Sequence, residues 1–154
     1  MKLQKFQKLT NINKLSKIIF LNFIELMNQD NIVFSIDDIE RLLISQNMTG
    51  WFLLDDNENI IGYLIGEKQN TNDGRFLFFI CYLYIIEEKR NKGYSKILLL
   101  NCLKFVKENN LYFTMIITKN NSIGNKLLEK YSFTKDPFIK IDNENYSLLL
   151  NYTF

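Results

Sequence analysis

The chain of 154 residues is 47% hydrophobic and 23% charged, a composition typical of a globular protein that can bury a core. Its formal net charge of +2 is too small, and its lysines are too evenly spread, to predict a surface for nucleic acid or membrane. The chain contains no histidine, which excludes His-based triads, histidine general bases and the common zinc sites, and we predict no metal.

The cysteines and the amino terminus indicate in which cellular compartment the protein is expected. Cys81 and Cys102 lie in apolar contexts without a CxxC motif, so we expect buried free thiols in a reducing environment. The amino terminus lacks the apolar core of a signal peptide, and no apolar run reaches the ~20 residues of a membrane span. We therefore expect a cytoplasmic protein. No repeat or linker is evident, so residues 1–154 are predicted to form one domain.

The elements expected in chain order follow from apolar periodicity and turn residues. Asn11 or Asn13 is expected to cap the first helix and Ser35 the second, with Asp38 at the capping-box position. The first half is expected to contain strand 2–9, a helix after Asn11 or Asn13 that runs to about 28, a helix after Ser35 that runs to about 46, and strands 51–54, 60–67 and 76–86. The second half is expected to contain a helix from about 96, strand 111–118, a helix capped by residues 120–122 that reaches 131, and strands 138–141 and 146–152. This order predicts a mixed sheet with helices on both faces.

The most informative stretch is the long apolar strand and the turn after it. Phe76 to Ile86 is a continuous apolar run, typical of a strand buried on both faces. The turn that follows it, before a helix, reads Arg90-Asn91-Lys92-Gly93-Tyr94-Ser95. The first amides of a helix attract anions, Arg90 and Lys92 add charge, and Gly93 allows close approach or a positive φ. Anion binding and an ordinary strand–helix turn both fit these six residues.

This turn resembles the Arg/Gln-x-x-Gly-x-Gly/Ala pyrophosphate loop of the GNAT N-acetyltransferases, with Ser95 at the last small position. It matches neither a Walker loop nor a Rossmann fingerprint. The order of elements along nearly the whole chain also resembles the GNAT order. The resemblance implies an α/β fold of GNAT type, with a mixed central sheet, splayed strands and helices on both faces. It also implies acetyl-CoA as cosubstrate, with its pyrophosphate held by residues 90–95.

A first motif within this resemblance is LYIIEEKRNKG, which is similar to the family's Leu-x-Val-x-Pro-Glu-x-Arg-Gly-Lys-Gly. Ile85 stands at the Val position, and Glu87 replaces the Pro. In the family this strand separates from the next one, here 111–118, and pantetheine pairs with backbone groups in the gap. The resemblance therefore places pantetheine at the backbone of Ile85, whose side chain is also expected to pack in the core.

A second motif, residues 121–133, is similar to the family's Asn-x-x-Ala-x-x-Leu-Tyr-x-Lys-x-Gly-Phe. Asn121 matches a residue that contacts the cofactor in some members, and a helix N-cap is the alternative. The tyrosine that protonates the leaving thiolate in many members falls on Leu128, which has no proton to donate. Tyr131, one helical turn further on, is a candidate substitute, with core packing as its alternative.

The general base is not evident from the sequence. Phe79 stands where histone-acetylating members carry a glutamate. The polar groups of the central strand are Cys81, Tyr82 and Tyr84. We take Tyr84 as a second candidate catalytic residue, and a water or a helix carboxylate such as Glu25 or Glu40 as a candidate base. Cys81 has no base to activate it and is not expected to act as a nucleophile.

These features predict an N-acetyltransferase that transfers an acetyl group directly from acetyl-CoA to a primary amine: a lysine side chain, a peptide amino terminus or a polyamine-like amine. A CoA-binding or interaction domain of GNAT fold that has lost its chemistry is one alternative, and an unrelated α/β binding domain is another. The resemblance implies that loops 28–34 and 136–145 select the acceptor. Carboxylates in or near them could attract a cationic amine: Asp30, Asp37, Asp136, Asp142 and Glu144. A homodimer through the apolar carboxyl-terminal strand is left open.

Overall fold

The computed structural model of the protein describes residues 1–139 and 141–153. The elements in chain order are β1 (Lys2–Phe6), α1 (Ile12–Gln29), α2 (Ile36–Leu43), β2 (Met48–Leu54), β3 (Ile60–Asn70), β4 (Phe76–Ile85), the 3-10 turn η1 (Glu87–Lys89), α3 (Tyr94–Glu108), β5 (Phe113–Lys119), α4 (Asn125–Lys130), β6 (Thr134–Lys135) and β7 (Tyr146–Tyr152). This order confirms the predicted alternation of strands and helices. No helix in the described residues is both long and apolar enough to cross a membrane.

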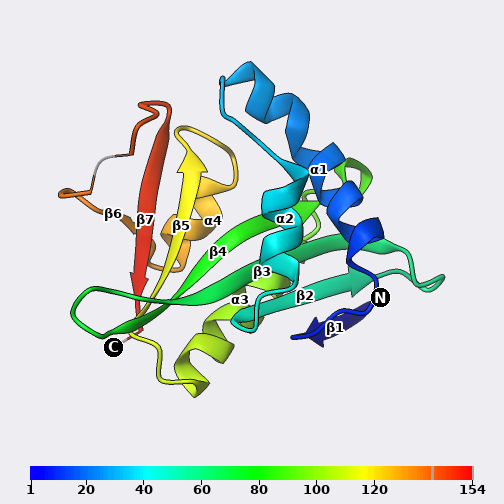
Figure 1. The fold of residues 1–154 in the computed structure, drawn as a ribbon, viewed down its shortest axis with the longest axis horizontal. Helices are drawn as coiled ribbons and strands as arrows, with labels where there is room; N and C mark the ends of the chain where they lie inside the picture. The colour runs from blue at the N-terminus through cyan, green and yellow to red at the C-terminus, as the bar shows by residue number, and fades with distance from the viewer. Residues whose placement is uncertain (140, 154) are drawn as a thin grey trace.

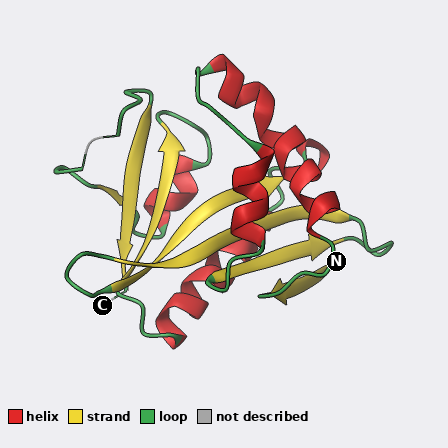
Figure 2. Ribbon diagram, viewed as in Figure 1, coloured by secondary structure: helices red, strands yellow, loops and turns green. Residues whose placement is uncertain are grey.

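The strands in the described part of the chain form one seven-stranded sheet, in the order β1-β2-β3-β4-β5-β7-β6. The pair β4–β5 is parallel and the other pairs are antiparallel. A parallel pair requires a crossover connection, which α3 supplies. Helices α1 and α2 cover one face of the sheet, and α3 and α4 cover the other (Figures 1 and 2). The predicted mixed sheet with helices on both faces is therefore confirmed.

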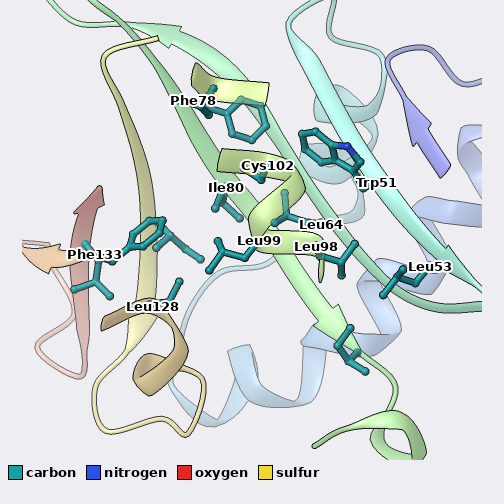
Figure 3. Packing of buried hydrophobic residues seen from close by; sticks show 14 of the residues in the cluster. Trp51, Leu53, Leu64, Phe78, Ile80, Leu98, Leu99, Cys102, Leu128 and Phe133 are labelled. Carbon is teal, nitrogen blue, oxygen red and sulfur yellow. The ribbon is translucent and has the colours of Figure 1, made fainter. Parts of the chain in front are cut away.

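Apolar side chains are buried on both faces of the sheet. The α3-side core contains residues of α3, α4 and the central strands, among them Phe78, Ile80, Leu98, Leu99 and Leu128 (Figure 3). The α1-side core packs α1 and α2 on β2 and β3, and includes Leu15, Ile19, Ile39, Tyr63 and Ile65. Because β4 lies between these two layers of helices, it needs apolar residues on both of its faces. This explains the continuous apolar run from 76 to 86.

Strands β4 and β5 pair over a short length and then separate. Their register runs from Leu77 opposite Phe113 to Ile80 opposite Ile116. Beyond this point β4 follows β3, and β5 follows β7. The two strands diverge visibly in Figure 1. A gap therefore opens in the middle of the sheet, as the sequence resemblance implied.

A bulge in β4 lies at the point of separation. Ile65 pairs with Tyr82 and Gly66 with Ile80, so Cys81 has no partner on β3. Such an extra residue bends its strand and increases its twist. The bulge needs a glycine opposite, because a Cβ on Gly66 would lie 2.3 Å from the carbonyl oxygen of Phe79. The bend turns the end of β4 away from β5.

Several predicted boundaries differ from the structure, and one predicted strand is absent among the described residues. Helix α2 ends at Leu43 and not near 46, and α4 begins at Asn125, after the residues predicted to cap it. The strand predicted at 138–141 is absent among its described residues, and Lys140 lies outside the described residues. The carboxylate of Asp136 accepts the N–H groups of Phe138 and Ile139, at 2.7 and 3.1 Å. This local turn takes up the amides that a strand would need for pairing.

The predicted cap of α2 is confirmed in part. The Ser35 hydroxyl accepts the N–H of Asp37 at 3.1 Å. The carboxylate of Asp38 does not complete the capping box but pairs with Arg41 at 3.1 Å. A single side-chain hydrogen bond thus fixes the start of this helix.

Candidate cofactor and acceptor site

The turn between β4 and α3 presents backbone amides to solvent. Gly93 precedes α3 in a left-handed conformation, with φ of 82°, and no side chain caps the helix. Asn91 also has a positive φ, of 63°. The first amides of α3 have no partner within the helix, and they lie at the positive end of its dipole. Nothing lies within 4 Å of a Cβ built on Gly93, so the space beside the turn is open.

The turn also carries uncompensated positive charge. Arg90, Lys92 and Lys96 lie within or directly after it, and all three residues are exposed. Among the described residues, none of them forms an ion pair with a carboxylate. Open space, outward amides and unpaired cations together fit an anionic group such as a pyrophosphate.

The gap between β4 and β5 runs from the bulge at Cys81 to the end of β4, next to this turn. Ile86 donates its N–H to the carbonyl of Ile61 on β3, at 3.0 Å. Because successive residues of a strand direct their backbone groups to opposite sides, Ile85 directs its own toward the gap. The Ile85 side chain is buried in the α3-side core, so it packs as expected. Across the gap, the Thr118 hydroxyl of β5 is buried and has no hydrogen-bond partner among the described residues.

Arg90 connects the turn to the gap. Its Nε donates a hydrogen bond of 2.8 Å to the carbonyl oxygen of Ile85. Its guanidinium carbon lies 5.2 Å from the centroid of the Tyr84 ring. The side chain therefore contacts the end of β4, at the residue whose backbone the sequence resemblance assigned to pantetheine.

Aromatic rings line the α1-facing side of the separated part of β4. Tyr84 stacks on Tyr63 at 5.8 Å between ring centroids and meets Phe23 edge-on at 5.6 Å. Tyr82 also contacts Phe23, at 5.4 Å. The Tyr63 hydroxyl accepts a hydrogen bond of 2.9 Å from Asn22, and burial raises the pKa of Tyr63. This side of the gap is apolar and carries tyrosine hydroxyls in place of carboxylates.

The sequence matches the profile of the acetyltransferase (GNAT) family over residues 18–133. The chain belongs to this family. No curated protein matches it. Both the family and the fold predicted from the sequence are thereby confirmed, with the separated strands and the turn at Gly93 in the places that the resemblance implied.

Solved structures with the same fold cover nearly all of the chain. NAA60 of Arabidopsis thaliana, in complex with a bisubstrate analogue, is 12% identical over 98% of both chains, with a TM-score of 0.73. A GNAT acetyltransferase of Staphylococcus aureus is 17% identical over 99% of this chain and 100% of its own, with a TM-score of 0.71. Tetrahymena Gcn5 is 17% identical over 100% and 97%, with a TM-score of 0.67. At these identities, the likeness concerns the fold.

The two catalytic candidates of this GNAT protein lie on opposite faces of the sheet. Tyr131 directly follows α4 as its C-cap, is half-buried and packs against the α3-side core. Tyr84 packs against the α1-side core and lies next to Ile85 in the separated part of β4. Leu128, which stands where many members have a tyrosine, is 3% exposed and packs near Phe133 (Figure 3). The fold thus does not bring Tyr84 and Tyr131 together.

The other candidate groups of the GNAT site are engaged or exposed. Glu40 accepts a hydrogen bond of 3.5 Å from Ser16, between α1 and α2, while Glu25 is exposed. Burial raises the pKa of the Cys81 thiol to about 12, and nearby Glu67 adds to the shift. A thiol that stays protonated at neutral pH is a poor nucleophile.

Asn121 is not the N-cap of α4, which begins later, after Gly124. It lies exposed in the turn after β5, with φ of 62°. The amide of Asn125 instead secures this turn by donating to the carbonyl of Lys119 at 3.0 Å. The cofactor contact predicted for Asn121 stays a prediction.

Sequence reasoning missed a polar bridge between the two loops expected to select the acceptor. The Asp30 carboxylate at the end of α1 pairs with Lys119 at 3.1 Å and accepts a hydrogen bond of 2.6 Å from the Tyr146 hydroxyl. Asn143 donates to the Asp30 carbonyl at 3.3 Å. The Asp30 side chain is only 10% exposed, and its two side-chain partners lower the pKa of its carboxyl. The carboxylate of Asp30 is therefore already bound by Lys119 and Tyr146. The residues Asp142 and Glu144, in contrast, are exposed.

Proposed function

We propose that the protein is an N-acetyltransferase that uses acetyl-CoA and a primary amine in a direct transfer. One observation carries this proposal: the gap between β4 and β5 opens beside the uncapped amino terminus of α3 at Gly93. A backbone edge and an anion-binding turn in one place suit a ligand that joins a peptide-like arm to a pyrophosphate. The structure of Arabidopsis thaliana NAA60 with acetyl-CoA supports this cosubstrate.

Two groups of residues would contact the two parts of acetyl-CoA. The amides and cations of residues 90–95 would hold the pyrophosphate, and Asn121 remains a candidate for a further contact. The backbone of Ile85 would hold the pantetheine, with the buried Thr118 hydroxyl across the gap. When bound, acetyl-CoA supplies the acetyl group as an activated thioester.

The chain's own contribution to the chemistry is positioning, desolvation and proton delivery. Holding the reacting groups in place can contribute about 7–11 kcal/mol. Apolar surroundings disfavour a charged ammonium, so the aromatic side of the gap would favour the neutral amine that attacks. Tyr84 is the hydroxyl best placed to donate or relay a proton, because it belongs to the separated part of β4. A general acid contributes about 10²–10⁴-fold in rate.

The acceptor class that these features support is a primary amine on a peptide, a protein or a small polyamine-like molecule. The exposed carboxylates of Asp142 and Glu144, on the loop before β7, would attract a cationic carrier. Asp30 would not act in this way, since Lys119 already pairs with it.

A second candidate function is CoA binding without turnover. The buried Leu128 favours it, because α4 then carries no hydroxyl at the position that supplies the acid in many members. Both candidates require the same cofactor site, and they differ in whether an amine is acetylated.

Calorimetric titration with acetyl-CoA and CoA tests the cofactor site, with Gly93→Glu as the variant and Gly74→Glu as its matched control. Both glycines have a left-handed φ, of 82° and 84°, and open space at the Cβ position. Each substitution should therefore cost a similar strain of about 1–2 kcal/mol. We expect micromolar binding for the wild type and Gly74→Glu, and at least a tenfold loss for Gly93→Glu.

No binding to the wild type at millimolar ligand would overturn both candidate functions. Equal loss in the two variants would show that strain, and not the site, is responsible. Where CoA binds, release of free thiol is then measured with a panel of peptides and amines. Turnover supports the acetyltransferase, and binding without turnover across the panel supports the second candidate.

A further inference from the structure

Arg90 belongs to both parts of the proposed acyl-CoA site, the turn for the pyrophosphate and the gap for the pantetheine. Arg90 is the first residue of the turn that would hold the pyrophosphate. Its Nε nevertheless donates to the carbonyl of Ile85, at 2.8 Å, and its guanidinium lies over the Tyr84 ring. It thus takes up a backbone acceptor that faces the gap, where a pantetheine amide would pair.

The two partners available to Arg90 differ in strength. A carbonyl is a neutral acceptor that takes one hydrogen bond from the guanidinium, whereas a pyrophosphate offers charged oxygens that attract its full charge and can accept two parallel hydrogen bonds from it. Arg90 is exposed, and no carboxylate among the described residues pairs with it. A pyrophosphate at the turn would therefore draw the guanidinium away from Ile85.

We propose that Arg90 determines the specificity of the protein for acyl donors that carry the phosphates of CoA. Its guanidinium blocks the Ile85 carbonyl until phosphate binding draws it to the turn, and that carbonyl then accepts the pantetheine amide. A donor without phosphates, such as an acyl-pantetheine, has to displace the guanidinium without compensation. This inference rests on the proposed function, because it concerns the same cofactor site.

Pantetheine carries no pyrophosphate, so a residue that only contacts phosphate should not affect its binding. Measuring pantetheine affinity therefore tests whether Arg90 also blocks the Ile85 carbonyl. The variants are Arg90→Ala and, as the control, Lys92→Ala, which removes an exposed cation of the same turn. Affinities for CoA and for pantetheine are measured by calorimetry and by NMR titration. We expect Arg90→Ala to bind CoA about tenfold more weakly but pantetheine severalfold more tightly. Lys92→Ala should weaken CoA binding and leave pantetheine unchanged.

A second measurement needs no variant. Two ligands that favour the same rearrangement bind cooperatively, with coupling of about 5-fold or more in typical cases. Inorganic pyrophosphate should therefore tighten pantetheine binding to the wild type about 5-fold and should have no such effect on Arg90→Ala. Circular dichroism of each variant checks that it is folded.

Pantetheine affinity that is unchanged, lower or undetectable in Arg90→Ala would overturn the inference, since Arg90 would then not obstruct the gap. Pyrophosphate without effect on pantetheine binding to the wild type would also overturn it. Failure of the proposed function has a different signature, because the wild type would then bind no CoA at all.

Discussion

Leu128 is buried and has no proton to donate at the position where the sequence resemblance implies an acid in many members of the family. The ring of Tyr131 packs against the same α3-side core as Leu128, away from the aromatic side of the gap. Tyr84 has the opposite placement: its ring lies among Phe23 and Tyr63, on the separated part of β4. At the scale of single residues, we therefore propose Tyr84 as the group that delivers the proton.

Tyr84→Phe tests this assignment. The substitution keeps the ring contacts with Phe23 and Tyr63 and removes only the hydroxyl. We expect the turnover number to fall about 10²-fold, in line with the loss of a general acid, while CoA affinity stays unchanged. Thiol release under saturating acetyl-CoA measures the rate. Tyr131→Phe is the matched control and should retain nearly full activity; a loss confined to Tyr131→Phe would reverse the assignment.

At the scale of the elements, the separation of β4 from β5 creates the candidate site. The bulge at Cys81 bends β4, and Gly66 permits this bend because its missing side chain leaves room for the Phe79 carbonyl. A carbonyl of the main chain cannot move aside as the end of a flexible side chain can. The path of β4, and with it the gap, thus depends on a glycine of the neighbouring strand.

Gly66→Ala should therefore destabilise the protein more than Gly74→Ala does. A methyl group at position 66 would meet the Phe79 carbonyl at 2.3 Å and the Phe78 ring at 2.7 Å, whereas the space at Gly74 is open. Overpacking of this kind costs about 1–3 kcal/mol or more. Urea unfolding of both variants measures the difference. Equal midpoints for the two variants would contradict this prediction. They would show that β4 can shift at a free-energy cost no greater than the backbone strain of an alanine at the left-handed position 74.

At the scale of the whole molecule, the separation of β4 from β5 divides the sheet into two halves, β1–β4 and β5–β7. These halves are joined differently on the two faces of the sheet. The α3-side core is continuous from β2 to β7 and includes Trp51, Ile116 and Leu149. On the other face the α1-side core ends at β4, and a separate small cluster of Leu77, Phe113 and Leu150 covers β5 and β7. The bridge from Asp30 to Lys119 and Tyr146 joins the two halves on this second face.

Asp30→Asn should weaken this link in a pH-dependent way. Hydrogen bonds from Tyr146 and Lys119 lower the pKa of the Asp30 carboxyl below its ordinary 3.8. Folding thus favours the ionised form, and its contribution to stability is complete above pH 3.8 and is lost as the pH falls through the lowered value. The wild type should therefore be more stable than Asp30→Asn at pH 7, and this advantage should shrink toward pH 2.

Urea unfolding at both pH values measures this advantage. Asp142→Asn, which changes an exposed carboxylate of the loop before β7, serves as the control and should have little effect at pH 7. An advantage that is the same at both pH values would show that the ionised carboxylate does not contribute.

The sequence alone was sufficient for the order of the elements and for the location of the turn between β4 and α3. Both depend on patterns within short stretches: the apolar run of 76–86, the helical spacing after it, and Gly93 between them. The strand predicted at 138–141, which is absent among its described residues, shows where such patterns fail. Asp136 and Pro137 favour a local turn there, and the apolar residues after them are exposed.

Only the tertiary structure decided where β4 and β5 separate, what Arg90 contacts, and whether Asp30 is available to an acceptor. Asp30 lies 89 residues from Lys119 and 116 from Tyr146, and no periodicity in the chain relates such positions. The contact of Arg90 with Ile85 is closer in sequence, but it requires that β5 has turned away from that carbonyl. Local patterns record which face of an element is apolar. Contacts between elements depend on bends and register, which a single glycine in a neighbouring strand can set.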